Sequence, residues 1–562
     1  MLQSLPSPTK NSLHSLKMRT PRLLFVLWLA TLILGCAEPQ STFPWKPIEL
    51  TFNGEQYLEN PYTDVNFYAQ FINEHGDTLL RPGFWNGNKE WKIRFNPLGA
   101  IGSWSYTTYS EPVIDGLHGQ QGQLKVVAPQ LETYTKMIPL KMSPGKRSVI
   151  DHSGKSKFLV ADTPWALPYR ATTEQVKNYA QFRQNQGFNA ALLMTLQPDT
   201  AAEGPNKRNT IKGFRRGFLD LYKGHINQMD PNYFKELDTL MSTLLNHDIM
   251  PIYQPLFHGF GWKGLGALGK TVEAKEYVRY CNYLLARYGA YPAIWLVGAD
   301  SDGNDPGVAD AGKHLEEWDA YRQPTGIHYN PFDTITPAWA IDFPEIGGGH
   351  FNKTHQSANW LDFQWCQTGH KGIHNYSKVA KMWHNHPLKG VANGEPTYEG
   401  ATNGSLANGP WQTEEAWGQL LNGGTMGIFY GAVGLFQWKI TADETGWKPW
   451  LNQPLNWEQA LHLDGANYVG HFSKFFEGLN SSDMELIKSS NGKNSIAAQD
   501  GSFYFLSVDS NESYAIPKKY EKHDVLWFLP QEGSFQKAVK HENVIQNKND
   551  FFKVLLVVLR EK

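Results

Sequence analysis

The sequence predicts an α/β protein with a central (β/α)8 TIM barrel over residues 150–479, flanked by one β-sandwich at 42–130 and another at 480–562. Three observations predict this fold. The chain has 562 residues, enough for several domains of about 150 residues each. Aromatic residues make up 13% of it, a composition that fills apolar cores and excludes a disordered or fibrous chain. The middle of the chain alternates strand-like and helix-like patterns, whereas both flanks carry short strand-like runs.

Residues 1–35 are predicted to be a signal peptide of the lipoprotein type. The apolar run 23–35 is shorter than the roughly 20 residues that a transmembrane helix needs. It leads into Cys36 through the sequence ILGC, which resembles a bacterial lipobox. We therefore expect secretion across the inner membrane and acylation of Cys36, which would anchor the protein to the outer membrane. Leu34 departs from the small residue preferred at its position, which leaves ordinary secretion open, and Met18 is an alternative start.

The amino-terminal flank has the rhythm of a sandwich. Its strand-like runs alternate apolar and polar residues or stay apolar, and Gly, Asn and Pro separate them. The candidate strands are 66–73, 90–97, 103–110 and 122–129.

From about residue 150 the pattern changes to strand followed by helix, repeatedly. The candidate strands are 157–163, 188–195, 249–257, 293–300, 324–331, 361–369, 390–396 and 425–433. Asp230 and Pro231 form an N-cap and a favoured first-turn proline for one intervening helix. Thr173 opens another helix, which Gly187 closes. Strands that alternate with helices eight times fit a barrel better than an open sheet.

The carboxyl-terminal flank returns to short strands, which predicts the second sandwich. Its candidate strands are 495–500, 502–509, 524–530 and 551–560.

Charge and cysteine content exclude several functional classes. A formal net charge of −2 gives no general field for gripping a polyanion, so we expect no nucleic-acid partner. Cys281 and Cys366 lie in apolar patterns and are expected to be core thiols, without a disulfide or a cysteine metal site. The sequence has no H-E-x-x-H, no G-x-S-x-G and no G-x-G-x-x-G in a strand–helix setting. We therefore expect no metal and no cofactor.

Catalytic groups of a barrel lie at the carboxyl ends of its strands. That rule selects Asp162, Gln254, His258, Asp300, Gln367, His370 and Glu395. Asp300 ends the fourth predicted strand and Glu395 the seventh. Two acids across a barrel mouth can cleave a glycosidic bond, since one protonates the leaving oxygen while the other attacks carbon. The alternative is structural, because strand-end acids often cap helices or pair with arginine. Asp300, with Asp302 and Asp305, could also belong to a cation-binding loop.

Five motifs, in order, resemble the apiosidase-like glycosidases, glycoside hydrolase family 140 and its relatives. They are FLVADTPW at 158–165, IWLVGAD at 294–300, WLDF at 360–363 with QTGH at 367–370, GEPTYE at 394–399, and Tyr430-Gly431 with Trp438. The segment around 81–95 resembles the small β-sandwich that precedes many bacterial glycosidase barrels. The resemblance implies that Asp300 is the acid/base and Glu395 the nucleophile. Ala161, Ala299 and Thr368 depart from the family pattern, which puts the substrate more in doubt than the chemistry.

The expected substrate-binding residues are Asp162, Trp165, His258, Gln367, His370, Tyr398, Glu399, Tyr430 and Trp438. Each has a structural alternative. Asp162 could cap the first helix, His370 could be a structural hydrogen-bonder, and Glu399 could form a surface ion pair. Trp438 is expected to stack on a sugar ring, although core packing is the usual role of a tryptophan.

Together these features predict a retaining glycoside hydrolase that acts on oligosaccharides derived from plant or algal polysaccharides. Its partners would be the oligo- or polysaccharide substrate and, through the lipid anchor alone, a membrane. The alternative is a surface glycan-binding lipoprotein whose barrel has lost activity. Retention of both Asp300 and Glu395 argues against it, because a binding protein has no need for the pair.

Overall fold

The structure is a computed structural model. It describes residues 40–129, 134–200, 204–259, 266–331, 353–370, 372, 374–401, 408–444, 453–548 and 555–560. The chain divides into two compact units, Met1–Pro39 and Gln40–Lys562. The expected signal peptide and Cys36 lie outside the described residues, so the expectation for them is unchanged. In the described ranges no helix is both long and apolar enough to span a membrane.

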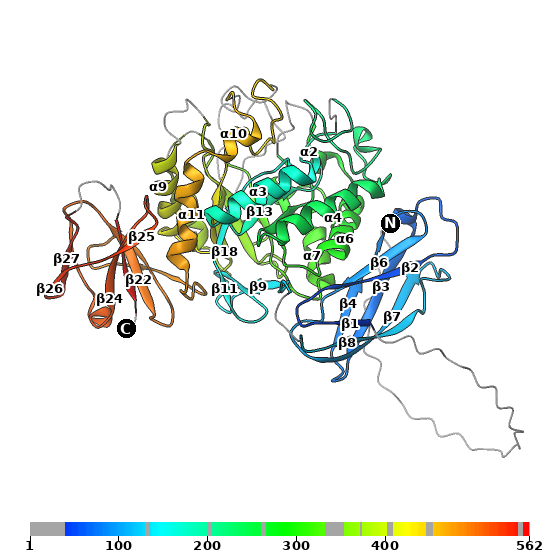
Figure 1. Cartoon of the computed structure of the whole chain (residues 1–562), viewed down its shortest axis with the longest axis horizontal. Helices are drawn as coiled ribbons and strands as arrows, with labels where there is room; N and C mark the ends of the chain where they lie inside the picture. Colours follow the sequence, from blue (N-terminus) through cyan, green and yellow to red (C-terminus); the bar gives the residue numbers. More distant parts are fainter. Residues whose placement is uncertain are drawn as a thin grey trace, which may run out of the picture. The chain divides into compact units, whose positions relative to one another are not determined.

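Eight parallel strands form the centre of the second unit and confirm the predicted barrel (Figure 1). They are β12 (Leu159–Asp162), β13 (Ala190–Met194), β14 (Met250–Gln254), β15 (Ile294–Ser301), β16 (Thr325–Tyr329), β17 (Phe363–Gln367), β18 (Gly390–Glu395) and β19 (Gly427–Tyr430). Neighbours from β12 to β18 pair in chain order, and β19 pairs with β12. Strands β18 and β19 lie side by side, which brings the sheet close to closure. Seven of these strands fall within their predicted segments, and β15 extends one residue beyond its segment, to Ser301.

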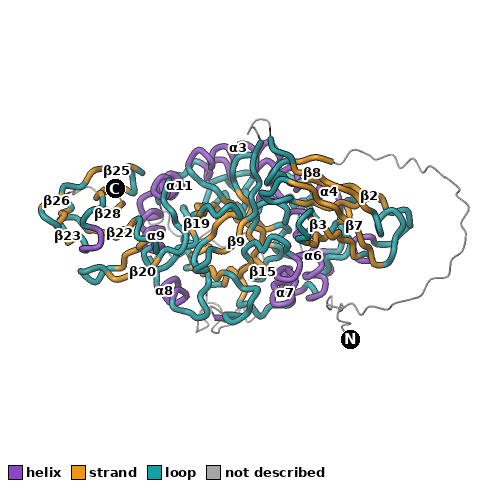
Figure 2. The backbone as a smooth tube through the Cα atoms, turned by 90° about the horizontal axis from the view of Figure 1, so that it is seen from below, coloured by secondary structure: helices purple, strands orange, loops and turns teal. Residues whose placement is uncertain are grey.

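Helices surround these strands, and Figure 2 shows them as a ring around β15 and β19. The longer ones are α3 (Thr173–Gln186), α4 (Pro231–Leu245), α6 (Ala274–Tyr288), α7 (Val308–Trp318), α8 (Ser377–Trp383), α9 (Gly409–Leu420) and α11 (Gly465–Phe476). Asp230 caps α4, as predicted, by accepting the N–H of Asn232 at 3.0 Å. Helix α3 begins as predicted, but its cap is Thr172, which forms a reciprocal capping box with Gln175.

The amino-terminal flank consists of two sheets around one apolar core. One sheet contains β1 (Gln40–Thr42), β3 (Asn66–Asn73), β4 (Thr78–Pro82), β7 (Gly102–Glu111) and β8 (Gln121–Val126), and the other contains β2 (Ile48–Asn53), β5 (Phe84–Trp85) and β6 (Glu90–Phe95). A three-stranded sheet of β9 (Leu140–Met142), β10 (Val149–Asp151) and β11 (Ser156–Lys157) follows. It meets the amino-terminal end of the barrel, where Arg147 contacts the carbonyl oxygens of Trp383 and Lys389.

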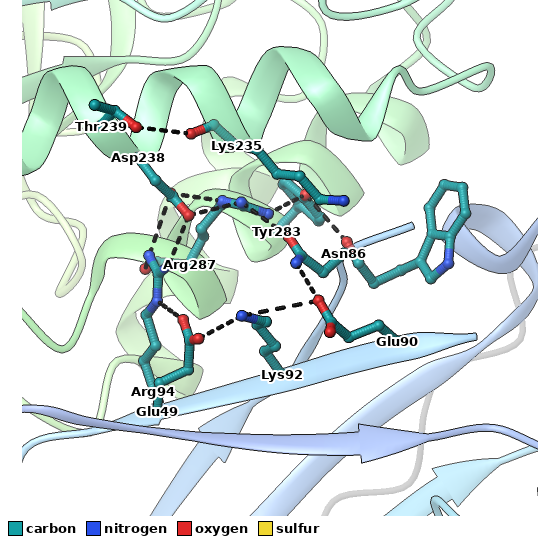
Figure 3. A network of polar contacts seen from close by, with 11 residues as sticks. Glu49, Asn86, Glu90, Lys92, Arg94, Lys235, Asp238, Thr239, Tyr283 and Arg287 are labelled. Atoms are coloured by element: carbon teal, nitrogen blue, oxygen red, sulfur yellow. Dashed lines mark hydrogen bonds and ion pairs between the residues drawn. The ribbon is translucent and has the colours of Figure 1, made fainter. Parts of the chain in front are cut away.

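A partly buried charge network joins the amino-terminal flank to the barrel helices (Figure 3). Asp238 on α4 lies 2.6 Å from Arg94 on β6 and 2.7 Å from Arg287 on α6. Glu49 on β2 completes the set, at 2.9 Å from Arg94. Burial raises the pKa of the Asp238 carboxyl, but the two guanidinium groups outweigh it and hold that pKa below its usual value. The charges therefore satisfy one another across the contact between the two parts.

The carboxyl-terminal flank is also built from two sheets. The larger contains β20 (Glu485–Lys488), β21 (Asn494–Ala497), β22 (Phe503–Val508), β28 (Leu555–Arg560), β24 (Asp524–Leu529) and β25 (Ser534–Lys537), and the smaller contains β23 (Ser513–Ala515), β27 (Val544–Gln546) and β26 (Lys540–His541). One face of the larger sheet belongs to the barrel's apolar core, since Phe505 packs edge-on against Phe475 of α11. The other face shares a separate core with the smaller sheet.

Candidate active site

The two acids selected from the sequence meet at the mouth of the barrel. Asp300 lies on β15, the fourth strand, and Glu395 ends β18, the seventh. A carboxylate oxygen of each and a ring nitrogen of His328 all lie within 4.8 Å of one another. Only 7% of the surface of Asp300 is exposed. The strand-end rule therefore selected two carboxyl groups that the fold brings together.

His328, on β16, lies between the two acids and was missed by the sequence reasoning. Its Nδ1 is 3.7 Å from Oδ1 of Asp300, and its Nε2 is 3.7 Å from Oε2 of Glu395. Complete burial lowers the pKa of the imidazole to about 4, so the ring is neutral near pH 7. The signal was present, because His328 lies at the carboxyl end of a predicted barrel strand.

The same three side chains are a candidate metal cluster by proximity alone. One ring nitrogen of His328 and one oxygen from each acid would be the ligand atoms. Neither ring nitrogen makes a hydrogen bond, and each lies 3.7 Å from a carboxylate oxygen.

A second candidate cluster comprises His225, Glu273 and Glu276. The Glu276 carboxylate already accepts hydrogen bonds from the backbone N–H of Ile226 and from the Asn227 side chain. Its role is to hold the loop before α4 against α6.

The backbone at Asp300 is strained. Its φ of 50° lies in the left-handed region, which is costly for a residue with a side chain and is common at functional sites. The conformation coincides with a register shift between Ala299 and Ser301. Gly259 approaches closely, because a Cβ there would lie only 2.8 Å from Oδ2 of Asp300. Gln367 donates a hydrogen bond to Oδ1 of Asp300. The carboxyl is thus enclosed and fixed.

Burial raises the pKa of Asp300 well above its usual value, and the negative charge of Glu395 raises it further. The protonated form of Asp300 is therefore favoured.

Glu395 lies in a different environment. His370 is 2.9 Å from Oε1 of Glu395 through its Nε2. Nδ1 of the same ring accepts the backbone N–H of Tyr398 at 3.2 Å, so the neutral ring carries its proton on Nε2 and donates it to the carboxylate. Burial alone raises the pKa of Glu395, but the hydrogen bond from His370, aided by the Tyr398 hydroxyl, outweighs it and leaves that pKa below its usual value. The pKa values of the two carboxyl groups are therefore shifted in opposite directions.

Four of the expected substrate-binding residues surround these acids. Gln367 and His370 bind Asp300 and Glu395 directly. Trp165 donates its indole N–H to the Tyr398 hydroxyl, and its ring lies 5.9 Å from that of His328.

Gln254, at the end of β14, is a further polar residue of this mouth. Its neighbour Tyr253 stacks on Tyr288 of α6, outside the barrel, so Gln254 points inward by strand alternation. It is fully buried, and neither its amide oxygen nor its amide nitrogen has a hydrogen-bond partner. An unpaired buried amide costs stability, which marks Gln254 as a group available to a ligand.

Asp162 and Tyr430 face away from the mouth, which corrects the expectation that they bind substrate. Ala161 pairs with Phe429, which contacts Trp365 across the intervening strand β18 and so points into the barrel. The next registered pair, Asp162 and Tyr430, therefore points outward. The Asp162 carboxylate lies 2.6 Å from Nε of Arg183 on α3, and both side chains are fully buried. Asp162 joins strand to helix.

Glu399 is also placed in the framework. Its carboxylate accepts the Tyr430 hydroxyl at 2.6 Å, the N–H of Gly409 at 3.2 Å and the N–H of Gly465 at 2.9 Å. Those glycines are the first residues of α9 and α11, where the positive ends of the helix dipoles lie. The carboxylate thus joins two helix starts rather than a sugar hydroxyl.

Trp438 and His258 are core residues, contrary to expectation. Trp438 is completely buried and stacks on Trp457 with ring centroids 4.7 Å apart, so it offers no free face to a sugar. His258 is equally buried, and its ring packs edge-on against Tyr277 of α6 at 5.4 Å. Burial lowers the pKa of His258, which keeps it neutral within the core.

A parallel eight-stranded barrel whose mouth holds two close carboxyl groups with opposite pKa shifts has the groups that glycosidic cleavage requires. The chain belongs to the apiosidase-like family, whose catalytic-domain model matches residues 143–483. A second model, a domain of unknown function (DUF5060), matches residues 42–111. Comparison with curated proteins finds no match.

Solved structures support the fold. A Bacteroides vulgatus protein provisionally assigned as a glycoside hydrolase has 16% identity and a TM-score of 0.66, over 93% of this chain and 100% of its own. A glycoside hydrolase family 5 structure from Bacteroides vulgatus has 16% identity and a TM-score of 0.57, over 75% of this chain and 93% of its own. A third structure, described as a glycoside hydrolase, has 15% identity and a TM-score of 0.56, over 77% of this chain and 99% of its own.

Proposed function

We propose that the protein is a retaining glycoside hydrolase that cleaves O-glycosidic bonds in oligosaccharides. The observation that carries this proposal is the pair of close carboxyl groups with opposite pKa shifts. Oxygens of Asp300 and Glu395 lie within 4.8 Å. Retaining enzymes hold their carboxyl groups about 5–5.5 Å apart, whereas inverting enzymes leave roughly 6.5–9.5 Å for a water molecule.

The reaction assigns one role to each acid. Glu395, ionised, attacks the anomeric carbon, and the bond to the leaving sugar breaks as Asp300 transfers its proton to the leaving oxygen. A glycosyl ester on Glu395 results. Asp300, now ionised, takes a proton from water, whose oxygen attacks the same carbon. The ester bond breaks, and both acids return to their starting states. Opposite pKa shifts supply the two protonation states that the first step needs.

Family membership favours a substrate from plant or algal polysaccharides with a terminal sugar such as apiose. The neutral amides of Gln254 and Gln367 suit the hydroxyl groups of such a sugar. The lipobox-like sequence before Cys36 supports lipid anchoring at the outer membrane. The alternative, an inactive glycan-binding lipoprotein, finds no support, since a binding surface needs neither the strained Asp300 nor its opposite-state partner.

The test is incubation of the purified protein with pectic, hemicellulosic and algal oligosaccharides, followed by chromatography of the released sugars. We expect one group of oligosaccharides to release a terminal sugar, and Glu395→Gln to release none. If no oligosaccharide is cleaved, or if Glu395→Gln cleaves as fast as the natural protein, the proposal fails.

A further inference from the structure

Glu415 on α9 is a buried acid behind the barrel mouth that the proposed mechanism does not use. Its Oε1 accepts the hydroxyl of Thr368 at 3.2 Å, and its Oε2 accepts the backbone N–H of Thr397 at 3.2 Å. Thr368 directly follows β17, and Thr397 lies two residues after β18. One carboxyl on a helix therefore binds the loops that leave the sixth and seventh strands.

These two loops carry Glu395 and its hydrogen-bond donor His370. They are also bonded to each other, since the N–H of Thr368 donates to the carbonyl oxygen of Glu395 at 3.3 Å. The Thr397 hydroxyl donates to the carbonyl oxygen of Gly369 at 3.1 Å. The hydrogen bond from the backbone N–H of Tyr398 to Nδ1 of His370, which fixes the tautomer of that ring, also joins these two loops. Displacement of either loop would thus alter the donor that keeps Glu395 ionised.

The surroundings of Glu415 favour a neutral acid. It lines a small cavity with Gln412 and Gln419, whose amide oxygens have no hydrogen-bond partner. A protonated carboxyl can donate to such an acceptor, whereas a carboxylate cannot. Burial raises the pKa of Glu415 to about 8, and the hydrogen bonds from Thr368 and Thr397 only partly oppose that shift.

The neighbouring elements bring few charges to it. On α8, Lys378 donates to the carbonyl oxygens of Gln367 and Pro331. Cys366 on β17 and Tyr376 before α8 are neutral, because burial raises the pKa of each group. Glu414 is the preceding residue on α9, and its backbone carbonyl oxygen accepts the hydroxyl of Tyr376 at 3.4 Å.

We propose that Glu415 is a positioning residue that, as a neutral carboxylic acid, holds the loops of Glu395 and His370 in their working geometry. The role of Glu415 in catalysis rests on the proposed hydrolysis. The pair of hydrogen bonds from Thr368 and Thr397 to Glu415, called here the tie, can be measured without substrate. The neutral form of Glu415 is favoured at neutral pH, and ionisation as the pH rises through about 8 would place a charge in the cavity. Thr368 and Thr397 would still donate to the carboxylate, so ionisation removes only the hydrogen bond that the neutral acid can donate to an amide oxygen.

The first experiment titrates the protein labelled with 13C at the glutamate carboxyl carbons. We expect one carboxyl signal to titrate near pH 8 and to be missing from Glu415→Gln. The absence of any glutamate that titrates above neutral pH would overturn the neutral-acid assignment, whether or not a substrate is found.

The second experiment compares Glu415→Gln, Glu415→Ala and the control Glu414→Ala by histidine 15N NMR, with His370 assigned from His370→Gln. The amide keeps an acceptor and cannot ionise, so the Nε2–H tautomer of His370 should persist in Glu415→Gln and in the control. In Glu415→Ala it should mix with the other tautomer. An unchanged His370 signal in a folded Glu415→Ala protein would overturn the proposal that Glu415 holds the two loops. The same mixture of His370 tautomers in Glu415→Gln as in Glu415→Ala would also overturn it.

On the oligosaccharide cleaved by the natural protein, Glu415→Ala should lower kcat by about 10- to 100-fold with little change in KM, as expected for misplaced reacting groups. Glu415→Gln should restore kcat. A loss confined to KM would contradict a positioning role. Failure to cleave any oligosaccharide would refute the proposed function alone, since both NMR tests stand without it.

Discussion

The Nε2 atom of His370 lies 2.9 Å from Oε1 of Glu395, and this hydrogen bond helps to hold the Glu395 carboxyl ionised at a buried position. The backbone N–H of Tyr398 occupies the other ring nitrogen of His370. The orientation of this donor is therefore set by the chain itself.

Loss of that donor should move the acid limb of the pH–activity profile. A hydrogen bond to a charged group contributes about 1.5–3 kcal/mol, or roughly one to two pH units. His370→Ala should raise the pKa of Glu395. As the pH is lowered, kcat/KM of the variant should therefore begin to fall at a higher pH than that of the natural protein. His370→Gln keeps a neutral donor and should shift the limb less. An acid limb at the same pH in His370→Ala would show that Glu395 does not depend on this contact.

The Gln254 amide should lower the stability of the free protein and strengthen its binding of substrate. Both polar atoms of its buried amide lack a partner, so Gln254→Met should raise the free energy of unfolding by about 1 kcal/mol and lower kcat/KM by roughly tenfold. Gln323 is the matched control, since its amide oxygen accepts the N–H of Ala293 at 2.8 Å. Gln323→Met should destabilise the protein. Denaturant unfolding and steady-state kinetics measure both effects, and a Gln254→Met variant that is destabilised with unchanged kcat/KM would refute the prediction.

The charge network between the amino-terminal flank and the barrel should be structural. Asp238→Ala leaves Arg94 and Arg287 without their shared carboxylate, which should cost about 3 kcal/mol of the free energy of unfolding. Asp310→Ala removes an exposed surface pair with Lys313 and should cost less than about 1 kcal/mol. Thermal unfolding of the two variants compares them directly. Equal stabilities would show that the network does not hold the parts together.

Cys36→Ser tests the lipid anchor. If Cys36 is acylated, the natural protein should partition into detergent and take up labelled fatty acid, and the variant should be found in the soluble fraction. Identical partitioning of the two proteins, with no label in either, would rule out the anchor.

The sequence predicted which residues lie at the mouth end of the barrel strands better than it predicted whether their side chains point into the barrel or out of it. Strand ends were visible as apolar runs followed by polar residues, which selected Asp300 and Glu395. The same rule selected Asp162, which lies at the mouth end of its strand but points outward to Arg183. Alternation decides between the two sides, and a four-residue strand such as β12 is too short to show it.

Two other features depend on contacts between distant segments. Tyr430 and Glu399 matched the family motifs, but they bind each other and two helix starts outside the barrel. Glu415 lies on a helix and shows no sequence signal, because its importance comes from Thr368 and Thr397 on separate loops. His328, in contrast, was accessible to the strand-end rule.

The covalent bond between the sugar and Glu395 is tested most directly with Asp300→Asn. Without Asp300, water is poorly activated, so a nitrophenyl glycoside of the released sugar should leave a glycosyl ester on the enzyme. Mass spectrometry of the digested, acid-quenched variant should find one added glycosyl group on the peptide that contains Glu395. Added azide should remove it as a glycosyl azide of retained configuration. An adduct on another residue, or a glycosyl azide of inverted configuration, would contradict the proposed mechanism.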